Sequence, residues 1–280
     1  QSLNVLEKKS KDEHSEAFAE AIKGINTVII DEVHMAKADV LKRLLTGPFA
    51  HCGIRWGLTG TVPKADYEFM GLKCSIGDVS NRIQASELQD KGVLANCHVN
   101  VLQTQDHPQF KTYGEELKWL TTDKVRMAWV AKTIKDISTS GNTLILVDRI
   151  SAGEILQEQI EDAVFVSGST KNVDRKEQYD EVSTATNKII IATYGVASVG
   201  INIPRIFNLV LIEPGKSFVR VIQSIGRGIR KAEDKENVQI WDITSSCKFA
   251  KRHLGARKKF YKEANYPYNI EKINYENPYT

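Results

Sequence analysis

Short apolar runs alternate with segments of helical periodicity along most of the chain. In the second half these runs are rich in Val, Ile and Leu, and helix-length stretches separate them. Strands buried on both faces of a sheet have this composition, and parallel strands need a long crossover, usually a helix. The alternation therefore predicts an α/β fold whose functional loops lie at the carboxyl ends of parallel strands. The predicted strands are 27–30, 54–58, 97–102, 143–147, 163–166, 188–192, 209–212 and 238–241.

Residues 103–124 interrupt this alternation. They begin with a polar run that ends at Pro108, and they show no clear period. We therefore expect a connector here, between a first domain at 1–102 and a second at 125–247. A basic tail with aromatic residues follows at 248–280. The 280 residues suit one large or two ordinary domains.

The composition excludes several classes of protein. The apolar runs are far shorter than the ~18 residues of a membrane span, and no signal segment opens the chain. The scattered cysteines form no CxxC pair, which favours reduced thiols in a cytoplasmic protein over zinc or disulfides. The net charge of +3 neither demands nor excludes nucleic acid, since local charge matters more than the sum.

The first candidate site follows strand 27–30. Asp31 and Glu32 place two adjacent carboxylates at its carboxyl end, and His34 comes two residues later. In nucleotide-hydrolysing folds one such carboxylate holds Mg²⁺ through water, and a second takes the proton of the attacking water. The alternative is a polar strand end whose acids cap the next helix.

Two further loops contain small and hydroxyl-bearing residues. Thr59, Gly60 and Thr61 follow strand 54–58, and segment 193–202 follows strand 188–192. Small residues allow close approach of the backbone to a neighbouring group. The second loop is suited to presenting amides and hydroxyls to a phosphate chain, although a tight strand-to-helix turn explains its glycines equally well.

The most specific pattern lies at 218–230. Apolar residues there repeat at helical spacing, and Gln223, Arg227 and Arg230 share another face at i, i+4 and i+7. Gly226 and Gly228 each destabilise a helix by about 1 kcal/mol relative to alanine. Two such residues in one helix therefore favour a functional reason for their presence. Guanidinium groups held this way can bind phosphate oxygens and transition-state charge, which we favour over a solvated basic face.

In chain order, these four segments resemble motifs II, III, V and VI of the DExH-type superfamily 2 helicases. The detail is most similar to phage recombination and repair helicases of the UvsW type, over nearly the whole chain. The resemblance implies RecA-like parallel sheets with helices on both faces. It also implies ATP and Mg²⁺ as cofactors and branched or forked DNA as the partner, with RNA–DNA hybrids as a further candidate. It implies a monomer in the cytoplasm, which is the host cell's if the protein is phage-encoded.

The resemblance assigns catalytic roles position by position. Asp31 matches the acid that binds magnesium through water, and Glu32 matches the residue that activates water. Gln223 corresponds to a position in the cleft between two motor domains. Arg227 and Arg230 correspond to residues that reach the γ-phosphate, and Arg230 is the better match to an arginine finger.

Other matching positions couple the motor or hold the nucleotide. His34, Thr59 and Thr61 correspond to residues that couple the ATP state to movement between domains. Gly200 and Asn202 correspond to positions near the bound nucleotide.

Nucleic-acid contacts are implied in two places. Arg149, Gly168 and Ser169 match loops that grip the backbone in the second motor domain, and Thr193 matches a position near that backbone. In the tail, the cations between 248 and 262 are interspersed with aromatic residues, and this stretch contains no acidic residue. This composition suits a phosphate backbone and an unpaired base, with contacts that include Arg257, Lys258 and Lys259. A solvated helix packed on the second domain is the alternative, and the safer one.

One departure from the family is large. No Gly-x-Gly-Lys-Ser/Thr loop lies upstream of the acid pair, and only 30 residues precede Asp31. Gly215-Lys216-Ser217 does not replace it, because a P-loop needs glycine where Val210 stands. We therefore expect the back part of a first motor domain and the whole of a second.

The expected function is that of an ATP-dependent DNA helicase or translocase acting on branched DNA in recombination, repair or replication-fork processing. Two alternatives stay open. One is a duplex translocase of the restriction-motor type, which does not separate strands. The other is a nucleic-acid-binding fragment with no catalysis of its own.

Overall fold

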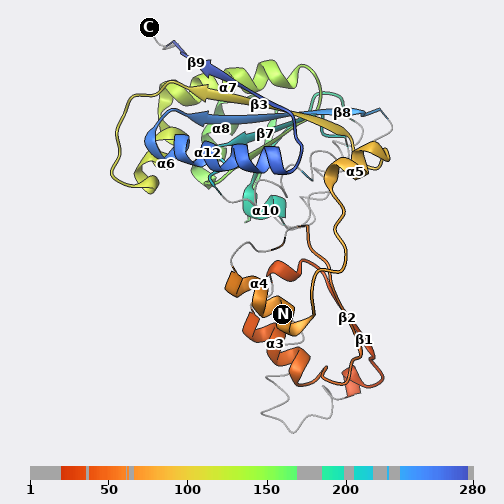
Figure 1. Ribbon diagram of the computed structural model, residues 1–280. Helices are drawn as coiled ribbons and strands as arrows, with labels where there is room; N and C mark the ends of the chain where they lie inside the picture. Colours follow the sequence, from red (N-terminus) through yellow and green to blue (C-terminus); the bar gives the residue numbers. More distant parts are fainter. Residues whose placement is uncertain are drawn as a thin grey trace. The chain divides into compact units, whose positions relative to one another are not determined.

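The fold is described from a computed structural model of the chain (Figure 1). The structure describes residues 20–35, 38–60, 62, 66–168, 185–198, 205–216, 226 and 234–276. The chain forms two compact units, Gln1–Arg82 and Ile83–Thr280, and each is described by itself.

The first unit contains a parallel pair of strands with helices packed on one of its faces. Strand β1 (Thr27–Ile30) pairs with β2 (Ile54–Gly57) in register, with Thr27 opposite Ile54. A 3-10 turn, η1 (Val33–Met35), and helix α3 (Ala38–Thr46) connect them, and α4 (Asp66–Ser75) follows. The core of the unit consists of side chains from the turn, from α3 and from the segment after it: Val33, Leu41, Leu45, Phe49 and Cys52.

The second unit is built on a seven-stranded sheet in the order β5-β6-β4-β7-β8-β3-β9, and every pairing is parallel. The strands near the middle of the sheet have almost continuously apolar sequences because helices cover both faces of the sheet. The strands are β3 (Asn96–Thr104), β4 (Thr143–Val147), β5 (Ala163–Val166), β6 (Ile189–Thr193), β7 (Asn208–Ile212), β8 (Asn237–Ser245) and β9 (Tyr268–Ile273).

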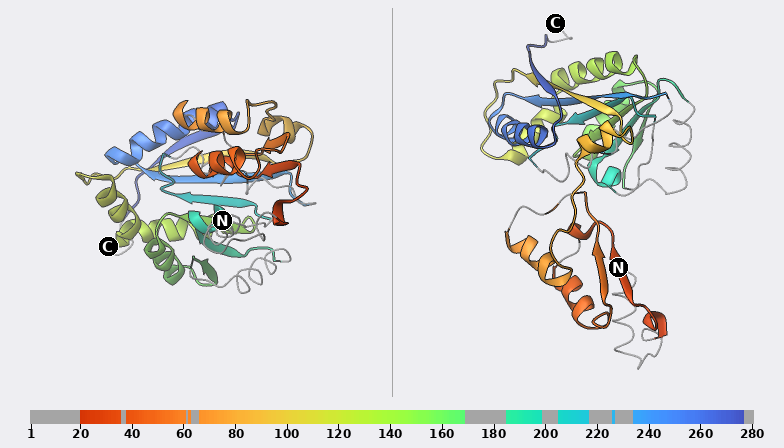
Figure 2. Two further views of the ribbon diagram at one scale, coloured as in Figure 1. Left: turned by 90° about the horizontal axis from the view of Figure 1, so that it is seen from below. Right: turned by 45° about the vertical axis from the view of Figure 1, so that its right-hand side comes forward.

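Helices pack on both faces of this sheet (Figure 2). Leu144 and Leu146 of β4 point to the face covered by α10 and α12, whereas Ile145 and Val147 point to the face covered by α7 and α8. This arrangement confirms the predicted α/β class. The described helices of the unit are α5 (Ala85–Asp90), α6 (Tyr113–Thr122), α7 (Lys124–Ser138), α8 (Ile150–Gln159), α10 (Tyr194–Ser198) and α12 (Lys248–Glu263).

The division between the units is not where the sequence placed it. Strand β3 was expected in the first domain, but it pairs with β8 from Asn96 opposite Asn237 to Thr104 opposite Ser245, and with β9 on its other side. Residues 83–102 therefore belong to the second unit. The placement was wrong because a strand's own sequence does not identify its partner strands.

Segment 103–124 is not a connector either. Its first two residues complete β3, and Tyr113–Thr122 forms α6. This helix begins with a capping box, in which the Thr112 side chain accepts from the Glu115 amide and the Glu115 carboxylate accepts from the Thr112 amide. The Thr-x-x-Glu signature is visible in the sequence and could have indicated the helix.

The expected tail is likewise part of the second unit. Ala250, Leu254 and Tyr261 of α12 are buried, and β9 adds a strand beside β3. The segment does form a helix packed on the second domain, and DNA contact by its exposed cations stays a prediction. Among the described helices, none combines the length and apolarity needed to cross a membrane.

Candidate functional site

The acid pair directly follows β1. Asp31 and Glu32 are exposed, and Glu32 has a φ of 48°, in the left-handed region that a side chain with a Cβ rarely adopts. The Asp31 carboxylate accepts a hydrogen bond of 2.8 Å from the Glu32 amide. This tight turn presents both carboxylates at the carboxyl end of the strand.

The loop after β2 is joined to this turn by main-chain and side-chain bonds. The Leu58 amide donates to the Ile30 carbonyl at 2.9 Å, and the Val33 amide donates to the Leu58 carbonyl at 3.0 Å. His34 Nδ1 and Thr59 Oγ1 form a hydrogen bond of 2.7 Å, whose donor depends on the histidine tautomer. The structure thus brings together two loops that the sequence identified separately.

His34 also faces the acid pair. Its Nδ1 lies 3.4 Å from Glu32 Oε2, and its side chain is only 5% exposed whereas that of Glu32 is 49% exposed. A buried imidazole therefore links the Thr59 hydroxyl to a solvent-accessible carboxylate.

The residues at the acid pair fit magnesium in one specific way. Among the described residues, no three His, Cys, Asp or Glu side chains are arranged to hold a metal ion. Mg²⁺ is usually bound by one or two carboxylates, together with water and substrate phosphates, and not by a cage of protein ligands. The exposed Asp31 carboxylate suits that mode.

Three predicted nucleic-acid contacts of the second unit lie along one edge of its sheet. Thr193 is the last residue of β6, and Arg149 and Gly168 come two residues after the ends of β4 and β5. These strands are neighbours in the sheet, with Val147 opposite Thr193. A Cβ added at Gly168 would meet nothing within 4 Å. The carboxyl edge is where open α/β sheets bind their ligands.

The other predicted site residues lie outside the described part of the chain, so their roles stay predictions. They are Thr61, Ser169, Gly200, Asn202, Gln223, Arg227 and Arg230.

Arg257 is not positioned as a DNA contact. It is 1% exposed, and its Nε and Nη2 donate to the two carboxylate oxygens of Asp242 at 2.8 and 2.9 Å. Its Nη1 donates to the Gly215 carbonyl, and the Tyr261 hydroxyl shares the Asp242 carboxylate. All edges of the guanidinium are therefore used inside the protein. Of the two lysines that were predicted as DNA contacts together with Arg257, Lys259 is exposed and Lys258 is partly buried.

A second buried polar network lies at the carboxyl ends of β3, β7 and β8, and the sequence analysis missed it. Arg126 Nη2 contacts Glu213 Oε1 at 2.7 Å, and Arg126 Nε lies 3.4 Å from Asp106 Oδ2. Burial raises the pKa of Glu213 to about 7, against the opposing effect of Arg126. Burial acts to raise the pKa of Asp106 too, but Arg126 and three hydroxyl donors hold it below its usual value. The only sequence signal was the presence of charged residues beside apolar strand ends.

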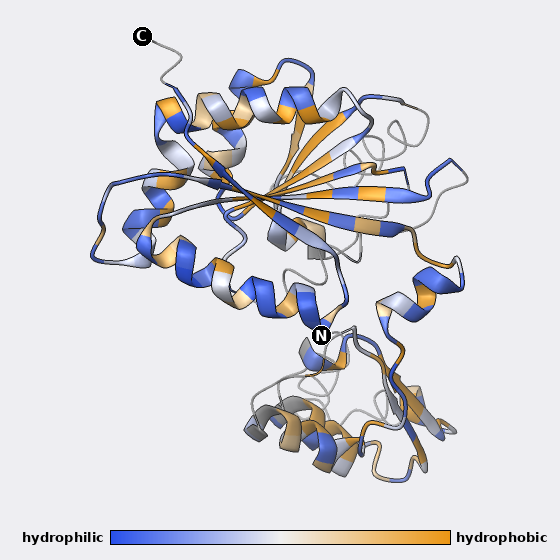
Figure 3. Ribbon diagram, turned by 45° about the horizontal axis from the view of Figure 1, so that its top comes forward, coloured by the Kyte–Doolittle hydropathy of each residue, from blue (hydrophilic) through white to orange (hydrophobic). Residues whose placement is uncertain are grey.

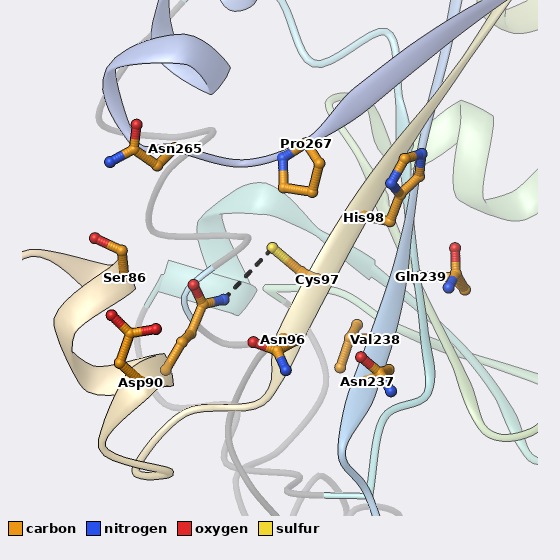
Figure 4. A pocket seen from close by; sticks show the side chains of 11 residues that line it. Ser86, Asp90, Asn96, Cys97, His98, Asn237, Val238, Gln239, Asn265 and Pro267 are labelled. Atoms are coloured by element: carbon orange, nitrogen blue, oxygen red, sulfur yellow. Dashed lines mark hydrogen bonds between the residues drawn. The ribbon is translucent and has the colours of Figure 1, made fainter.

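A polar pocket lies at the opposite edge of the sheet (Figure 4). Its volume is about 430 Å³, and its lining includes Asn96 and Asn237, which begin β3 and β8. Burial raises the pKa of the Cys97 thiol in this pocket to about 11, so the thiol stays protonated. Because the pocket lies at the amino ends of the strands, it is separate from the candidate residues at the carboxyl edge.

Comparison with known proteins supports a helicase assignment for the second unit. Residues 126–232 match the model of the helicase conserved C-terminal domain. With the sheet and helices described above, this match assigns the second unit to the class of helicase conserved C-terminal domains.

Within that class the chain is related to the ATP-dependent DNA helicase UvsW of Enterobacteria phage T4. The two are 26% identical over 241 residues, which is 82% of this chain and 48% of UvsW. The crystal structure of T4 UvsW matches 91% of this chain and 55% of the UvsW chain, with a TM-score of 0.56 and 22% identity. This likeness confirms the RecA-like fold.

Two other proteins match large parts of the chain. Subunit XPB of the general transcription and DNA repair factor IIH of Drosophila melanogaster, a helicase/translocase, is 24% identical over 259 residues, which is 87% of this chain and 32% of XPB. A fragment of an HsdR subunit of a type I restriction enzyme from Vibrio vulnificus YJ016 has the same fold. Its TM-score is 0.69 at 18% identity, over 89% of this chain and 48% of the fragment. The chain spans about half the length of UvsW and a third of XPB.

Proposed function

We propose that the chain is the later part of an ATP-dependent DNA helicase motor. The first unit would be the back part of one motor domain, and the second unit would be the other motor domain. The observation that carries the proposal is the bonding of the Asp31–Glu32 turn to the Thr59 loop through His34. The helicase match at residues 126–232 and the relationship to UvsW support it.

ATP hydrolysis would use the exposed end of β1. Asp31 would hold Mg²⁺ through water, and the ion, when bound, supplies positive charge to the phosphate oxygens. Glu32 would take the proton of the attacking water, since its carboxylate is accessible to solvent while its backbone is held in a tight turn. We propose that Arg227 and Arg230 stabilise the charge that develops on the γ-phosphate, and that Gln223, Gly200 and Asn202 contribute to the nucleotide site.

The DNA strand would run along the carboxyl edge of the second sheet. Thr193 ends β6, Arg149 and Gly168 follow the ends of the neighbouring strands β4 and β5, and Ser169 follows Gly168 in the chain. Phosphate contacts of this kind come from arginine, hydroxyls and backbone amides, and they position a strand without reading its sequence. We propose that the substrate is branched or forked DNA, with RNA–DNA hybrids as a further substrate, and that the motor acts as a monomer.

The proposal is tested by assaying the intact protein on forked DNA with and without ATP. A helicase hydrolyses ATP faster when DNA is present and releases a strand. A duplex translocase of the restriction-motor type would hydrolyse ATP without releasing a strand. DNA binding without DNA-stimulated hydrolysis would contradict the motor and favour a nucleic-acid-binding fragment.

A further inference from the structure

The cations of α12 are divided by the helical period into two opposite faces. Positions 248, 251, 252, 255, 259 and 262 fall on one solvent-exposed stripe, and Arg257 lies on the opposite, buried face. We call the exposed set the α12 stripe; it consists of Lys248, Lys251, Arg252, Gly255, Lys259 and Lys262. In the described part of the chain, no ion pair involves these cations. The only acid of the helix is its last residue, Glu263.

The α12 stripe is held in a fixed orientation. At the start of the helix, the buried Glu116 of α6 accepts hydrogen bonds from the Phe249 and Ala250 amides at 3.1 and 2.7 Å. In its second half, Arg257 is clamped on Asp242 of β8. The cations therefore project from a rigid helix and not from a loose tail, which lowers the ordering cost of binding a ligand.

Gly255 lies in the middle of the stripe. It is exposed inside a sixteen-residue helix, and a Cβ added there would meet nothing within 4 Å. Neither packing nor an unusual backbone angle requires glycine at this position, although glycine is a poorer helix former than alanine. The missing side chain leaves the helix backbone open to close approach by a ligand.

Contacts link the stripe to the carboxyl edge of the sheet. Arg149 Nη2 donates to the Gly114 carbonyl at 3.3 Å, and the adjacent Tyr113 ring lies 4.7 Å edge-on from the His253 ring of α12. The Tyr113 ring also lies 6.4 Å from Phe249, and this phenylalanine is flanked by Lys248 and Arg252, at 5.4 and 5.2 Å from its ring. Residues at the start of α6 thus contact both Arg149, just after β4, and the first turns of α12, and Figure 1 shows α6 beside α12.

We propose that the α12 stripe binds the phosphate backbone of a single DNA strand that continues from the carboxyl edge. The inference rests on the proposed function, since it requires a strand at that edge. A sixteen-residue helix is about 24 Å long, enough to lie against several phosphates. The stripe has cations and a glycine but no apolar core of the kind that protein partners bury, and Figure 3 shows α12 as mainly hydrophilic. The neighbouring aromatic rings suit unpaired bases.

The test is binding of a labelled single-stranded oligonucleotide to the full chain, followed by fluorescence anisotropy over a range of salt concentrations. The variant is Lys251→Glu with Lys259→Glu. Its matched control is Lys132→Glu with Lys135→Glu, two exposed lysines on α7, which packs on the other face of the sheet. We expect the α12 pair to lose about tenfold or more in affinity and to lower the salt slope by roughly 0.7 per lost phosphate contact. The control keeps most of its affinity.

Other outcomes overturn the inference in distinguishable ways. Equal losses in the two double variants would show that net charge alone matters, and the α12 stripe would have no role while the motor proposal stands. If polyglutamate of equal total charge displaced the oligonucleotide from the stripe, the binding partner of the stripe would be an acidic protein and not a DNA strand. No binding by the wild-type chain would contradict the nucleic-acid part of the proposed function itself.

Gly255→Ala provides a second test that does not depend on charge. Alanine strengthens the helix, so we expect a higher melting temperature. If the strand approaches the helix backbone, the same variant binds the oligonucleotide about threefold or more weakly, which corresponds to the loss of one close phosphate contact. A variant that is more stable and binds with unchanged affinity would show that the stripe is a solvated face.

Discussion

Glu32 combines a strained backbone with a solvent-accessible carboxylate. Strained residues persist where the surrounding structure holds them, and here the Asp31 side chain and the bonded Thr59 loop do so. Asp162 is also an exposed acid with a positive φ, of 68°, but Glu32 in addition lies 3.4 Å from the His34 imidazole. The strain is therefore consistent with the catalytic role that we propose for Glu32.

We expect Glu32→Gln to lower ATP turnover of the intact protein about 10²-fold to 10⁴-fold, since the amide cannot accept a proton from water. DNA affinity should be unchanged. The measurements are steady-state ATP hydrolysis and equilibrium DNA binding. Glu158→Gln on the exposed face of α8 is the matched control. Near-normal turnover in Glu32→Gln would contradict the assignment of this site.

The hydrogen bond between His34 and Thr59 gives a prediction on coupling. Thr59→Val keeps the side-chain shape but removes the hydroxyl, so the His34 ring loses its partner at 2.7 Å. One hydrogen bond of this kind contributes about 1 kcal/mol, enough for a severalfold to tenfold effect. We expect strand displacement per ATP to fall by that factor, while ATP turnover changes less.

The control for this prediction is Thr46→Val. Thr46 donates its hydroxyl hydrogen bond to the Lys42 carbonyl on the exposed surface of α3, away from the acid pair. If Thr46→Val reduced displacement as much as Thr59→Val, or if turnover and displacement fell together, the coupling role of Thr59 would be wrong.

On the scale of elements, α12 shows how one helix can have two unlike faces. Its buried face holds a charged network around Asp242, and its exposed face holds the α12 stripe. His253 lies on the buried side, beside the Tyr113 ring. Burial lowers the pKa of His253 to about 4, and Arg257, Arg252 and Lys216 act in the same direction.

The histidine makes the stability of this element depend on pH. In the unfolded chain His253 takes up a proton as the pH falls below about 6.5, whereas in the folded protein it does so only near 4. Protons then favour the unfolded state, so the free energy of unfolding falls between pH 6.5 and 4. We expect a loss of about 2 kcal/mol at pH 5 relative to pH 7 from this residue.

His253→Phe tests this prediction because phenylalanine keeps the ring but cannot be protonated. Urea denaturation at pH 5 and pH 7 should show a smaller difference for the variant than for the wild type. His51→Phe, at an exposed site of the first unit, is the control and should keep the wild-type difference. An unchanged difference in His253→Phe would show that the acid sensitivity comes from other groups.

For the whole molecule, the position of β3 decides which fragment can fold alone. This strand lies between β8 and β9, and its side chains Val99 and Val101 are completely buried. The second unit, residues 83–280, contains both main cores of its sheet. A fragment that begins at 103 would lack an internal strand and expose the edges of its two neighbours.

We therefore expect residues 83–280 to fold independently and to unfold cooperatively, whereas residues 103–280 should aggregate or stay unfolded. Circular dichroism with thermal unfolding, together with size-exclusion chromatography, distinguishes the two fragments. A cooperative transition in the shorter fragment would show that β3 is not essential to the sheet.

The residues by themselves determined the α/β class, because short apolar runs rich in Val and Ile that alternate with helix-length segments are typical of buried parallel strands. They also pointed to the acid pair and the Thr59 loop as candidates, since these positions directly follow predicted strands, whereas Arg149, Gly168 and Thr193 came from the resemblance to a helicase family. The capping box of Thr112 and Glu115 is also visible in the sequence.

Only the tertiary structure decided which strands pair and which charges are buried. Strand β3 joins the second sheet through partners about 140 and 170 residues away in the chain, and no local pattern specifies such a pairing. Arg257 and Lys259 look equivalent in a basic segment, yet one is clamped on Asp242 and the other faces solvent. The physical reason is the same in both cases: pairing and burial are set by contacts between residues far apart in sequence, which form only when the chain has folded.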